Sequence, residues 1–215
     1  MLLDCGNGIL SRLQQFHAIQ EINAIFLSHL HFDHIGDLFL LRYAYETMLA
    51  FGDGDFLPIP VYLPATPREI VDLLRVEELF TFHFMQEDTN HTIGELQFRF
   101  QRMQHSVECY GIGVNEGDKR LVYSGDTSFH EVLIEFVGGA DMFLCEATTS
   151  GKDASPVPLP HLNARQAGEI AAQAQVGRLL LTHNSFMEER QEILLCAQQY
   201  FAASELVEEM RTYEV

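Results

Sequence analysis

Residues 29–34 read His-Leu-His-Phe-Asp-His and place four side chains that can bind a metal ion within six positions. The run follows the apolar segment Asn23–Leu27, which is typical of a strand, and precedes an apolar-periodic segment typical of a helix. In an extended chain, residues two apart point the same way, so His29 and His31 are expected to face one point. Imidazole nitrogens and carboxylate oxygens are ligands that Zn²⁺ and similar ions prefer. The sequence therefore predicts a metal site at the end of a strand.

A helix N-terminus that is rich in histidine, with Asp33 as a capping acid, is the alternative interpretation. Four potential ligands in six residues are poorly explained by capping, however. The run resembles the HxHxDH signature of the metallo-β-lactamase superfamily, and residues 2–8 (Leu-Leu-Asp-Cys-Gly-Asn-Gly) resemble the strand and D-x-G-x-G turn of that family. The later motifs follow in the family's order, each after a strand-like apolar run, at His105, Asp126 and His183.

This resemblance implies two divalent metal ions, Zn²⁺ with Mn²⁺ or Fe as alternatives. Seven side chains, each in a matched motif, would bind them. In the family's pattern the first ion is held by His29, His31 and His105, the second by Asp33, His34 and His183, and Asp126 bridges the two. Outside such a set, a single histidine like His105 or His183 is usually an ordinary hydrogen-bonded residue.

Within the superfamily, two further motifs resemble those of ribonuclease Z-like phosphodiesterases. Residues 145–148 (Cys-Glu-Ala-Thr) are similar to the E-A-T motif, and residues 161–168 begin like the H-[ST]-x-A-type motif. The resemblance implies that His161 is a general acid or stabilises a phosphate oxygen, that Glu146 orients it, and that Asp33 is catalytic as well as metal-binding. Alternatively, His161 only flanks a helix and Glu146 is a strand-end acid.

The substrate is predicted to be small. In tRNA-processing members a long basic arm lies between the histidine and aspartate motifs, but here twenty residues, 106–125, separate them and read as a hairpin. The chain has 13 basic and 31 acidic residues and a formal charge of −18. Proteins that bind nucleic acid normally present clustered Lys and Arg. We therefore expect a small phosphoester as substrate, and no folded tRNA.

The predicted fold is α/β: an αββα sandwich of two mixed sheets flanked by helices, as in the metallo-β-lactamase fold. Because the family usually has strands before the Leu2–Gly8 segment, we expect either a truncated N-terminus or a misassigned start. No linker or repeat divides the chain, so we predict one domain over 1–215. Residues 51–58 are expected to form a loop. The predicted helices are 34–50, 67–79, 129–137, 163–174 and 188–203, and the predicted strands are 60–63, 96–103, 110–114, 121–124, 142–145 and 178–181.

The remaining expectations concern location and activity. No apolar run reaches the roughly 20 residues of a membrane span, and the four cysteines form no C-x-x-C pair, so a cytoplasmic protein without membrane contact is expected. A homodimer is implied by the resemblance alone. The predicted activity is that of a dinuclear metal-dependent phosphodiesterase acting on small diesters, cyclic nucleotides or short RNA through a hydroxide that bridges the metals. Cleavage of a thioester, lactone or sulfate ester is the alternative, and a redox di-iron protein or a metal-bound interaction module is a third class.

Overall fold

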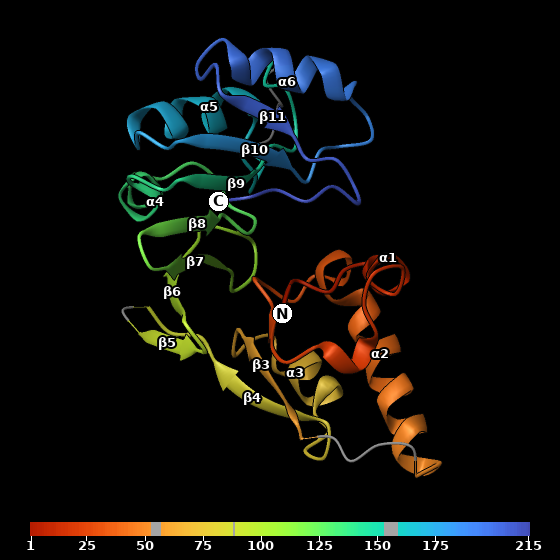
Figure 1. Ribbon diagram of the computed structural model, residues 1–215. Helices are drawn as coiled ribbons and strands as arrows, with labels where there is room; N and C mark the ends of the chain where they lie inside the picture. The colour runs from red at the N-terminus through yellow and green to blue at the C-terminus, as the bar shows by residue number, and fades with distance from the viewer. Residues whose placement is uncertain (53–56, 88, 153–158) are drawn as a thin grey trace. The chain divides into compact units, whose positions relative to one another are not determined.

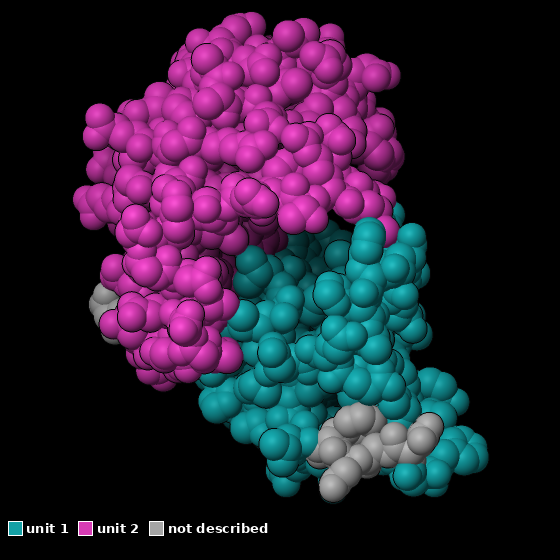
Figure 2. Space-filling view, in the orientation of Figure 1, with its two compact units in different colours: residues 1–85 teal, residues 86–215 magenta. Residues whose placement is uncertain are grey.

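The computed structural model describes residues 1–52, 57–87, 89–152 and 159–215. The chain divides into two compact units, Met1–Met85 and Gln86–Val215, which are coloured separately in Figure 2. Each unit contains one sheet and its own helices (Figure 1). The single domain over 1–215 stays a prediction.

Unit 1 is built on a four-stranded sheet in the order β1-β2-β3-β4. All its described pairs are parallel, where a mixed sheet was predicted, because helices connect the successive strands and return the chain to the same sheet edge. The strands are β1 (Leu2–Leu3), β2 (Ile25–Phe26), β3 (Ile59–Leu63) and β4 (Phe80–Phe84); the helices are α1 (Ile9–Leu13), the 3₁₀ helix η1 (Ile19–Glu21), α2 (Phe32–Ala50) and α3 (Arg68–Leu74).

The core of unit 1 joins one face of this sheet to α2. Ile25 and Val61 from the strands and Ile35, Leu38 and Leu41 from the helix are all fully buried in one cluster. The spacing of the helical residues places them on one stripe, which is why the segment folds as a helix against the sheet. Burial of this stripe fixes the start of α2 and therefore the position of the histidine run, residues 29–34.

Unit 2 is built on a seven-stranded sheet in the order β11-β10-β9-β8-β7-β6-β5. Strands β5 to β8 pair antiparallel, and β8 to β11 pair parallel, so this sheet is mixed as predicted. The strands are β5 (Asn90–Ile93), β6 (Leu96–Arg102), β7 (Tyr110–Glu116), β8 (Lys119–Tyr123), β9 (Met142–Glu146), β10 (Arg178–Thr182) and β11 (Ser204–Leu206); the helices are α4 (Glu131–Val137), α5 (Ala164–Gln173) and α6 (Arg190–Gln198).

Three helices pack on the parallel part of this sheet. Val122, Phe143 and Leu179 from the strands share a buried cluster with Leu133 of α4 and Ile170 of α5. The start of α5 carries a capping box, as the amide of Gln166 donates to Asn163 Oδ1 at 2.9 Å and the amide of Asn163 donates to Gln166 Oε1 at 3.1 Å. This cap fixes the segment that follows His161.

Most differences from the predicted elements lie at their ends. Helix α3 stops at Leu74 rather than 79, because Arg75 takes an extended backbone and the chain turns toward β4, which was not predicted. Helix α6 ends at Gln198 rather than 203, since residues 204–206 leave it to pair with β10. Strand β5 and helix α1 were also missed. Residues 53–56 of the predicted loop 51–58 lie outside the described residues.

Candidate metal centre

The histidine run of unit 1 lies where β2 ends and α2 begins. His29 Nε2 lies 3.0 Å from His31 Nδ1, and His34 Nε2 lies 3.6 Å from Asp33 Oδ2. Two ligands on one tetrahedral zinc ion stand roughly 3.3 Å apart when each metal–ligand bond is about 2.0–2.1 Å. Both pairs are close to this spacing, so the donor set in unit 1 fits a metal ion of this kind.

Asp4 supports the run from the end of the neighbouring strand β1. Its Oδ1 accepts a hydrogen bond from the Ser28 amide at 2.6 Å, and its Oδ2 accepts from Ser28 Oγ at 2.8 Å and lies 2.7 Å from His34 Nδ1. Burial alone would raise the pKa of Asp4, but the hydrogen bond and charge of His34, with smaller contributions from the Ser28 amide and the charge of His29, lower it, and the net pKa is lowered. An ionised carboxylate therefore holds the ring of a predicted ligand, an arrangement common around metal-bound histidine.

In unit 2 the candidate residues gather at the carboxyl ends of the strands. Asp126 lies just beyond β8, Glu146 ends β9, and His183 follows β10. Because β8, β9 and β10 are parallel, their carboxyl ends lie at one sheet edge. Strand β6 runs antiparallel to β7, which runs antiparallel to β8, so His105 beyond β6 reaches the same edge. The order of strands thus explains how four distant residues come together.

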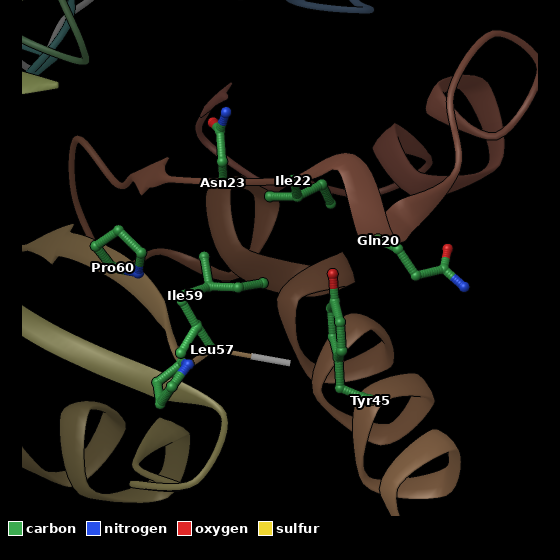
Figure 3. A pocket seen from close by; sticks show the side chains of 8 residues that line it. Gln20, Ile22, Asn23, Tyr45, Leu57, Ile59 and Pro60 are labelled. Atoms are coloured by element: carbon green, nitrogen blue, oxygen red, sulfur yellow. The ribbon is translucent and has the colours of Figure 1, made fainter. Parts of the chain in front are cut away.

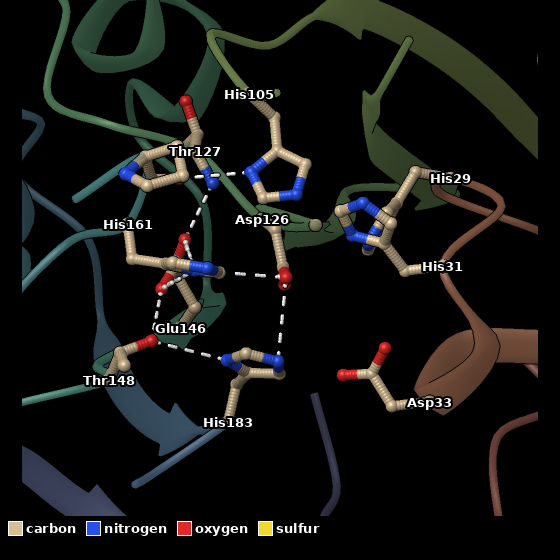
Figure 4. A network of polar contacts seen from close by, with 12 residues as sticks. His29, His31, Asp33, His105, Asp126, Thr127, Glu146, Thr148, His161 and His183 are labelled. Atoms are coloured by element: carbon tan, nitrogen blue, oxygen red, sulfur yellow. Dashed lines mark hydrogen bonds and ion pairs between the residues drawn. The ribbon is translucent and has the colours of Figure 1, made fainter. Parts of the chain in front are cut away.

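His161 reaches this edge from the loop before α5. That loop runs beside the segment after β9, since the amide of Thr148 donates to the carbonyl of Leu162 at 3.0 Å and the amide of Ala164 donates to the carbonyl of Thr149 at 2.7 Å. The ring is thereby held over Glu146, as Figure 4 shows.

The side chains at this edge are within ligand distance of one another. His183 Nε2 lies 3.4 Å and His161 Nδ1 lies 3.7 Å from Asp126 Oδ2, and the donor atoms of His105, Asp126 and His161 all lie within 4.8 Å of each other. Glu146, His161 and His183 form a second such group. Figure 4 shows these side chains converging on Asp126. The edge therefore offers imidazole and carboxylate donors in numbers that suit a divalent ion.

Hydrogen bonds to the second ring nitrogen orient several of these histidines. Nδ1 of His105 donates to the carbonyl oxygen of Pro160 at 2.9 Å, and Nδ1 of His183 lies 3.2 Å from Thr148 Oγ1. In unit 1, Nδ1 of His29 lies 3.1 Å from Ser28 Oγ. With Nδ1 engaged, Nε2 is the nitrogen of each ring that can bind a metal ion.

Glu146 is the fully buried acid of the site. It accepts hydrogen bonds from the Thr127 amide and from Thr148 Oγ1, the latter at 2.8 Å, and its Oε2 lies 3.1 Å from His161 Nδ1. Burial raises the pKa of Glu146, the contact with His161 lowers it, and the nearby charge of Asp126 raises it, with a net increase. Glu146 is thus placed to orient His161 rather than to face solvent.

The structure brings together the predicted residues of each unit. His29, His31, Asp33 and His34 are contiguous in unit 1, and His105, Asp126, His183, His161 and Glu146 meet in unit 2. Ligation of one ion by residues from both units stays a prediction. The roles of Asp4 and Thr148 were not predicted, although both belong to motifs that the sequence singled out.

A hollow of about 500 Å³ in unit 1 lies elsewhere (Figure 3). Its lining includes Asn23, Pro58 and Tyr45, and the first two precede strands β2 and β3, whereas His29 follows β2. Tyr45 Oη donates to the carbonyl oxygen of Ile19 at 2.6 Å, which ties α2 to η1. This hollow is thus at the sheet edge opposite the ligand run.

Comparison with known proteins identifies the family. The model of the beta-lactamase superfamily domain matches residues 1–184. The chain belongs to this superfamily. It is 31% identical over 183 residues to the probable metallo-hydrolase YhfI of Bacillus subtilis, covering 85% of this chain and 74% of that protein. It is 25% identical to a ribonuclease Z of Methanothermobacter thermautotrophicus over 272 residues, covering 100% of this chain and 87% of that protein.

Solved structures agree with the predicted fold class. The crystal structure of the metallo-beta-lactamase fold protein YhfI matches with a TM-score of 0.90 at 27% identity, covering 99% of this chain and 87% of that chain. A diphosphatase from the PhnP family matches with a TM-score of 0.74 at 18% identity, covering 100% and 79%, which bears on the fold alone. The predicted superfamily, its ribonuclease Z-like relatives and the α/β fold with two sheets flanked by helices are therefore confirmed. Among the described residues, none of the helices is both long and apolar enough to cross a membrane.

Proposed function

We infer that this chain is a metal-dependent hydrolase, and we propose that it cleaves small phosphodiesters. Family membership and the imidazole and carboxylate donors support the first statement. The observation that carries the second is the pairing of His161 with the buried Glu146 beside Asp126. With Nδ1 held by this acid, His161 can present Nε2 as a donor, and phosphoryl chemistry benefits from a group that can donate to an oxygen of the phosphate.

The imidazole and carboxylate donors of each unit suit divalent ions, and the sequence resemblance implies two such ions. His29, His31 and His105 would hold one ion, Asp33, His34 and His183 the other, and Asp126 would bridge them. When bound, the ions would supply Lewis acidity and lower the pKa of water toward neutrality. Zn²⁺ suits this donor set, with Mn²⁺ or Fe as alternatives. The grouping of His105, Asp126 and His161 would also allow a different ligand set, in which His161 itself binds metal.

His161 would act on the phosphate through its second ring nitrogen. Its Nδ1 is held by both carboxylate oxygens of Glu146, at 3.1 and 3.2 Å, so Nε2 points away from that acid. From there it would donate a hydrogen bond to a phosphate oxygen or a proton to the leaving group. Asp33, whose side chain is 65% exposed, and Asp126 would orient the attacking water. Glu146 is a positioning residue in this scheme.

The surface charge supports a compact substrate. Several basic side chains are engaged by acids in their own unit, among them Arg42 with Glu46 and Arg178 with Glu205. With a formal charge of −18, the chain offers little to bind a polyanion by counterion release. One or two phosphate charges could still be balanced locally by divalent ions. We therefore propose a small phosphoester, and no folded tRNA, as the substrate.

The decisive experiment compares three substrates with protein of measured metal content: bis(p-nitrophenyl) phosphate, p-nitrophenyl sulfate and a thioester. We expect cleavage of the phosphodiester to require about two metal ions per chain. His31→Ala and Asp126→Ala should each lower turnover by about a hundredfold or more. His161→Ala should lower turnover and leave the metal content intact. His17→Ala, which removes an exposed histidine paired with Glu21, serves as the matched control and should change neither.

The outcomes separate the alternatives. Metal loss in the His161 variant would assign this residue to the ligand set and remove its proposed role at the phosphate. Activity on the thioester or the sulfate alone would favour the second class of hydrolase. No hydrolysis with metals bound would favour a redox or interaction role.

Two further expectations remain proposals. A cytoplasmic location is supported by Cys5, Cys109, Cys145 and Cys196, none of which forms a disulfide in the described part of the chain. A homodimer rests on the resemblance alone.

A further inference from the structure

Large apolar side chains are exposed beside each of three site residues of unit 2. Phe129 follows Asp126 by three positions and is 39% exposed, and Leu159 precedes His161 by two and is 45% exposed. Phe186 and Met187 follow His183 and are 95% and 78% exposed. We call Phe129, Leu159, Phe186 and Met187 the apolar rim.

The chain keeps the apolar rim close to the site. Successive Cα atoms are about 3.8 Å apart, so Phe129 and Phe186 have their Cα atoms within about 11 Å of those of Asp126 and His183. The Cα atom of Leu159 lies within about 8 Å of that of His161 by the same argument. Single exposed apolar residues are ordinary, but several gathered around one set of polar residues are typical of a binding surface.

The backbone that carries Phe186 is fixed rather than loose. The amide of Ser185 donates to the carbonyl of Thr148 at 2.8 Å, and the amide of Met187 donates to Ser185 Oγ at 3.1 Å. Asn184 Nδ2 also donates to the carbonyl of Ala147 at 2.9 Å. These bonds join the turn after His183 to the segment after β9, yet the Phe186 side chain projects into solvent.

A backbone group next to each of the other two rim residues, Phe129 and Leu159, is held as well. The amide of Ser128, next to Phe129, donates to the carbonyl of Gln104 at 2.8 Å. Pro160, next to Leu159, accepts the hydrogen bond from Nδ1 of His105. An exposed aromatic group on a fixed backbone loses little conformational freedom when a ligand covers it, which favours binding.

We propose that the apolar rim binds an aromatic substituent of the substrate, so that the natural ester carries an aryl or heteroaryl group next to the scissile phosphate. This proposal rests on the proposed phosphodiesterase function and narrows its substrate class. Two phenylalanine rings and a methionine suit an aromatic partner, since rings stack on rings and thioethers contact ring edges favourably. The rim carries no charge and adds no repulsion toward an anionic diester.

The first test measures binding rather than turnover. Diphenyl phosphate and dimethyl phosphate are titrated by calorimetry into zinc-loaded protein; the two anions share their charge and differ in the aromatic groups. We expect diphenyl phosphate to bind more tightly, and Phe186→Ala to weaken it by about tenfold, the size expected for loss of one stacked aromatic partner. In the same variant, the affinity for dimethyl phosphate should change by less than about twofold, well below the effect of losing one stacked ring.

Two control variants keep this test specific. Leu195→Ala removes a 53% exposed apolar residue of α6 that does not belong to the rim, and it should leave both affinities unchanged. Phe186→Tyr keeps the ring and should retain the preference for diphenyl phosphate. Equal binding of the two phosphates, or an equal loss of both in Phe186→Ala, would overturn the proposal, as would a failure of wild type to bind either.

The second test uses turnover and separates this proposal from the proposed function. Bis(p-nitrophenyl) phosphate and methyl p-nitrophenyl phosphate have the same leaving group and differ in the substituent that is retained. Phe186→Ala should raise KM for the first substrate by about tenfold and leave kcat and metal content unchanged. If Phe186→Ala hydrolyses bis(p-nitrophenyl) phosphate with an unchanged KM, the proposed role of the apolar rim is wrong. Absence of hydrolysis with intact selectivity for diphenyl phosphate refutes the phosphodiesterase function and leaves the rim supported.

Discussion

Replacing Asp4 by asparagine should weaken metal binding by the proposed ligand His34 and leave that side chain in place. The two side chains have the same shape, so the amide oxygen of asparagine can keep the bond from the Ser28 amide. The amide NH₂ then takes the place of Oδ2, which lies 2.7 Å from His34 Nδ1. A donor at this position favours the tautomer of His34 in which Nδ1 carries no proton. The proton then moves to Nε2 of His34, the ring nitrogen that lies beside Asp33 and would bind the metal ion.

The size of the effect follows from two separate losses. Removing a partner that orients a metal-bound histidine typically lowers metal affinity by about 10- to 100-fold, or about 1.4–2.7 kcal/mol. The metal-free protein loses the hydrogen bond that Ser28 Oγ donates to Asp4 Oδ2, because an amide NH₂ cannot accept it. Loss of this bond to a buried carboxylate costs about 1.5–3 kcal/mol of stability. The variant should therefore stay folded and bind metal weakly.

The assay is a competition between the protein and a chromophoric zinc chelator, with urea unfolding of the metal-free protein alongside. Asp37→Asn is the matched control, because Asp37 is another buried carboxylate of unit 1. It accepts a hydrogen bond from the Leu10 amide at 2.9 Å. The control should lose stability and keep its metal affinity.

Two results would refute the reasoning. If folded Asp4→Asn binds zinc as tightly as wild type, then Asp4 does not set the tautomer of His34, or His34 is not a ligand. If Asp37→Asn weakens zinc binding as strongly, the loss reflects general destabilisation of α2, the helix that carries His34 and Asp37. Both results rest on affinity measured under conditions where the proteins are folded.

Three other substitutions test packing and hydrogen bonding within the two units. Gly168→Ala places a Cβ 2.8 Å from a carbonyl oxygen of α6. We expect a destabilisation of about 1–3 kcal/mol, which calorimetry should show as a Tm lowered by about 2–4 °C per kcal/mol. The metal affinity should stay unchanged. In Gly6→Ala the Cβ would lie 1.9 Å from the Asp33 carbonyl oxygen, so the start of α2 must move, and zinc titration should find weaker binding. Arg120→Met removes two hydrogen bonds to carbonyls at the end of α4 and should cost about 1–3 kcal/mol in urea unfolding at constant activity. Unchanged zinc affinity in the Gly6 variant, or lost activity in the Arg120 variant, would contradict these expectations.

The residues of the site could be predicted because strand ends place them. His183 follows an apolar run that folds as β10, and Asp126 follows another that folds as β8. The apolar run before each residue therefore predicted that it lies at a sheet edge. The two-residue spacing of His29 and His31 likewise predicted, from local geometry alone, that their rings lie close together. In these cases the signal lies within a few residues of the ligand.

Other features could not be predicted because their partners are far apart in the sequence. Asp4 contacts His34 thirty residues later, and the pairing depends on β1 and β2 lying side by side. Strand β11 has three residues, and its existence depends on pairing with β10 rather than on its own pattern. The early end of α3 at Leu74 similarly reflects the pairing of β4 with β3, which competes with helical periodicity.

Asp4 and His183 share an unusual backbone conformation. Asp4 and His183 both have positive φ, at 58° and 53°, a region that side chains other than glycine rarely adopt. Each follows directly on a strand and is held by contacts from a neighbouring one, Asp4 through Ser28 and His183 through Thr148. Such conformations persist where the surroundings fix them, and they concentrate at functional sites. The local backbone preference is thus violated at His183, a predicted ligand, and at Asp4, the acid that orients the predicted ligand His34. This supports the interpretation that the backbone at these strand ends positions ligands at a cost in local stability.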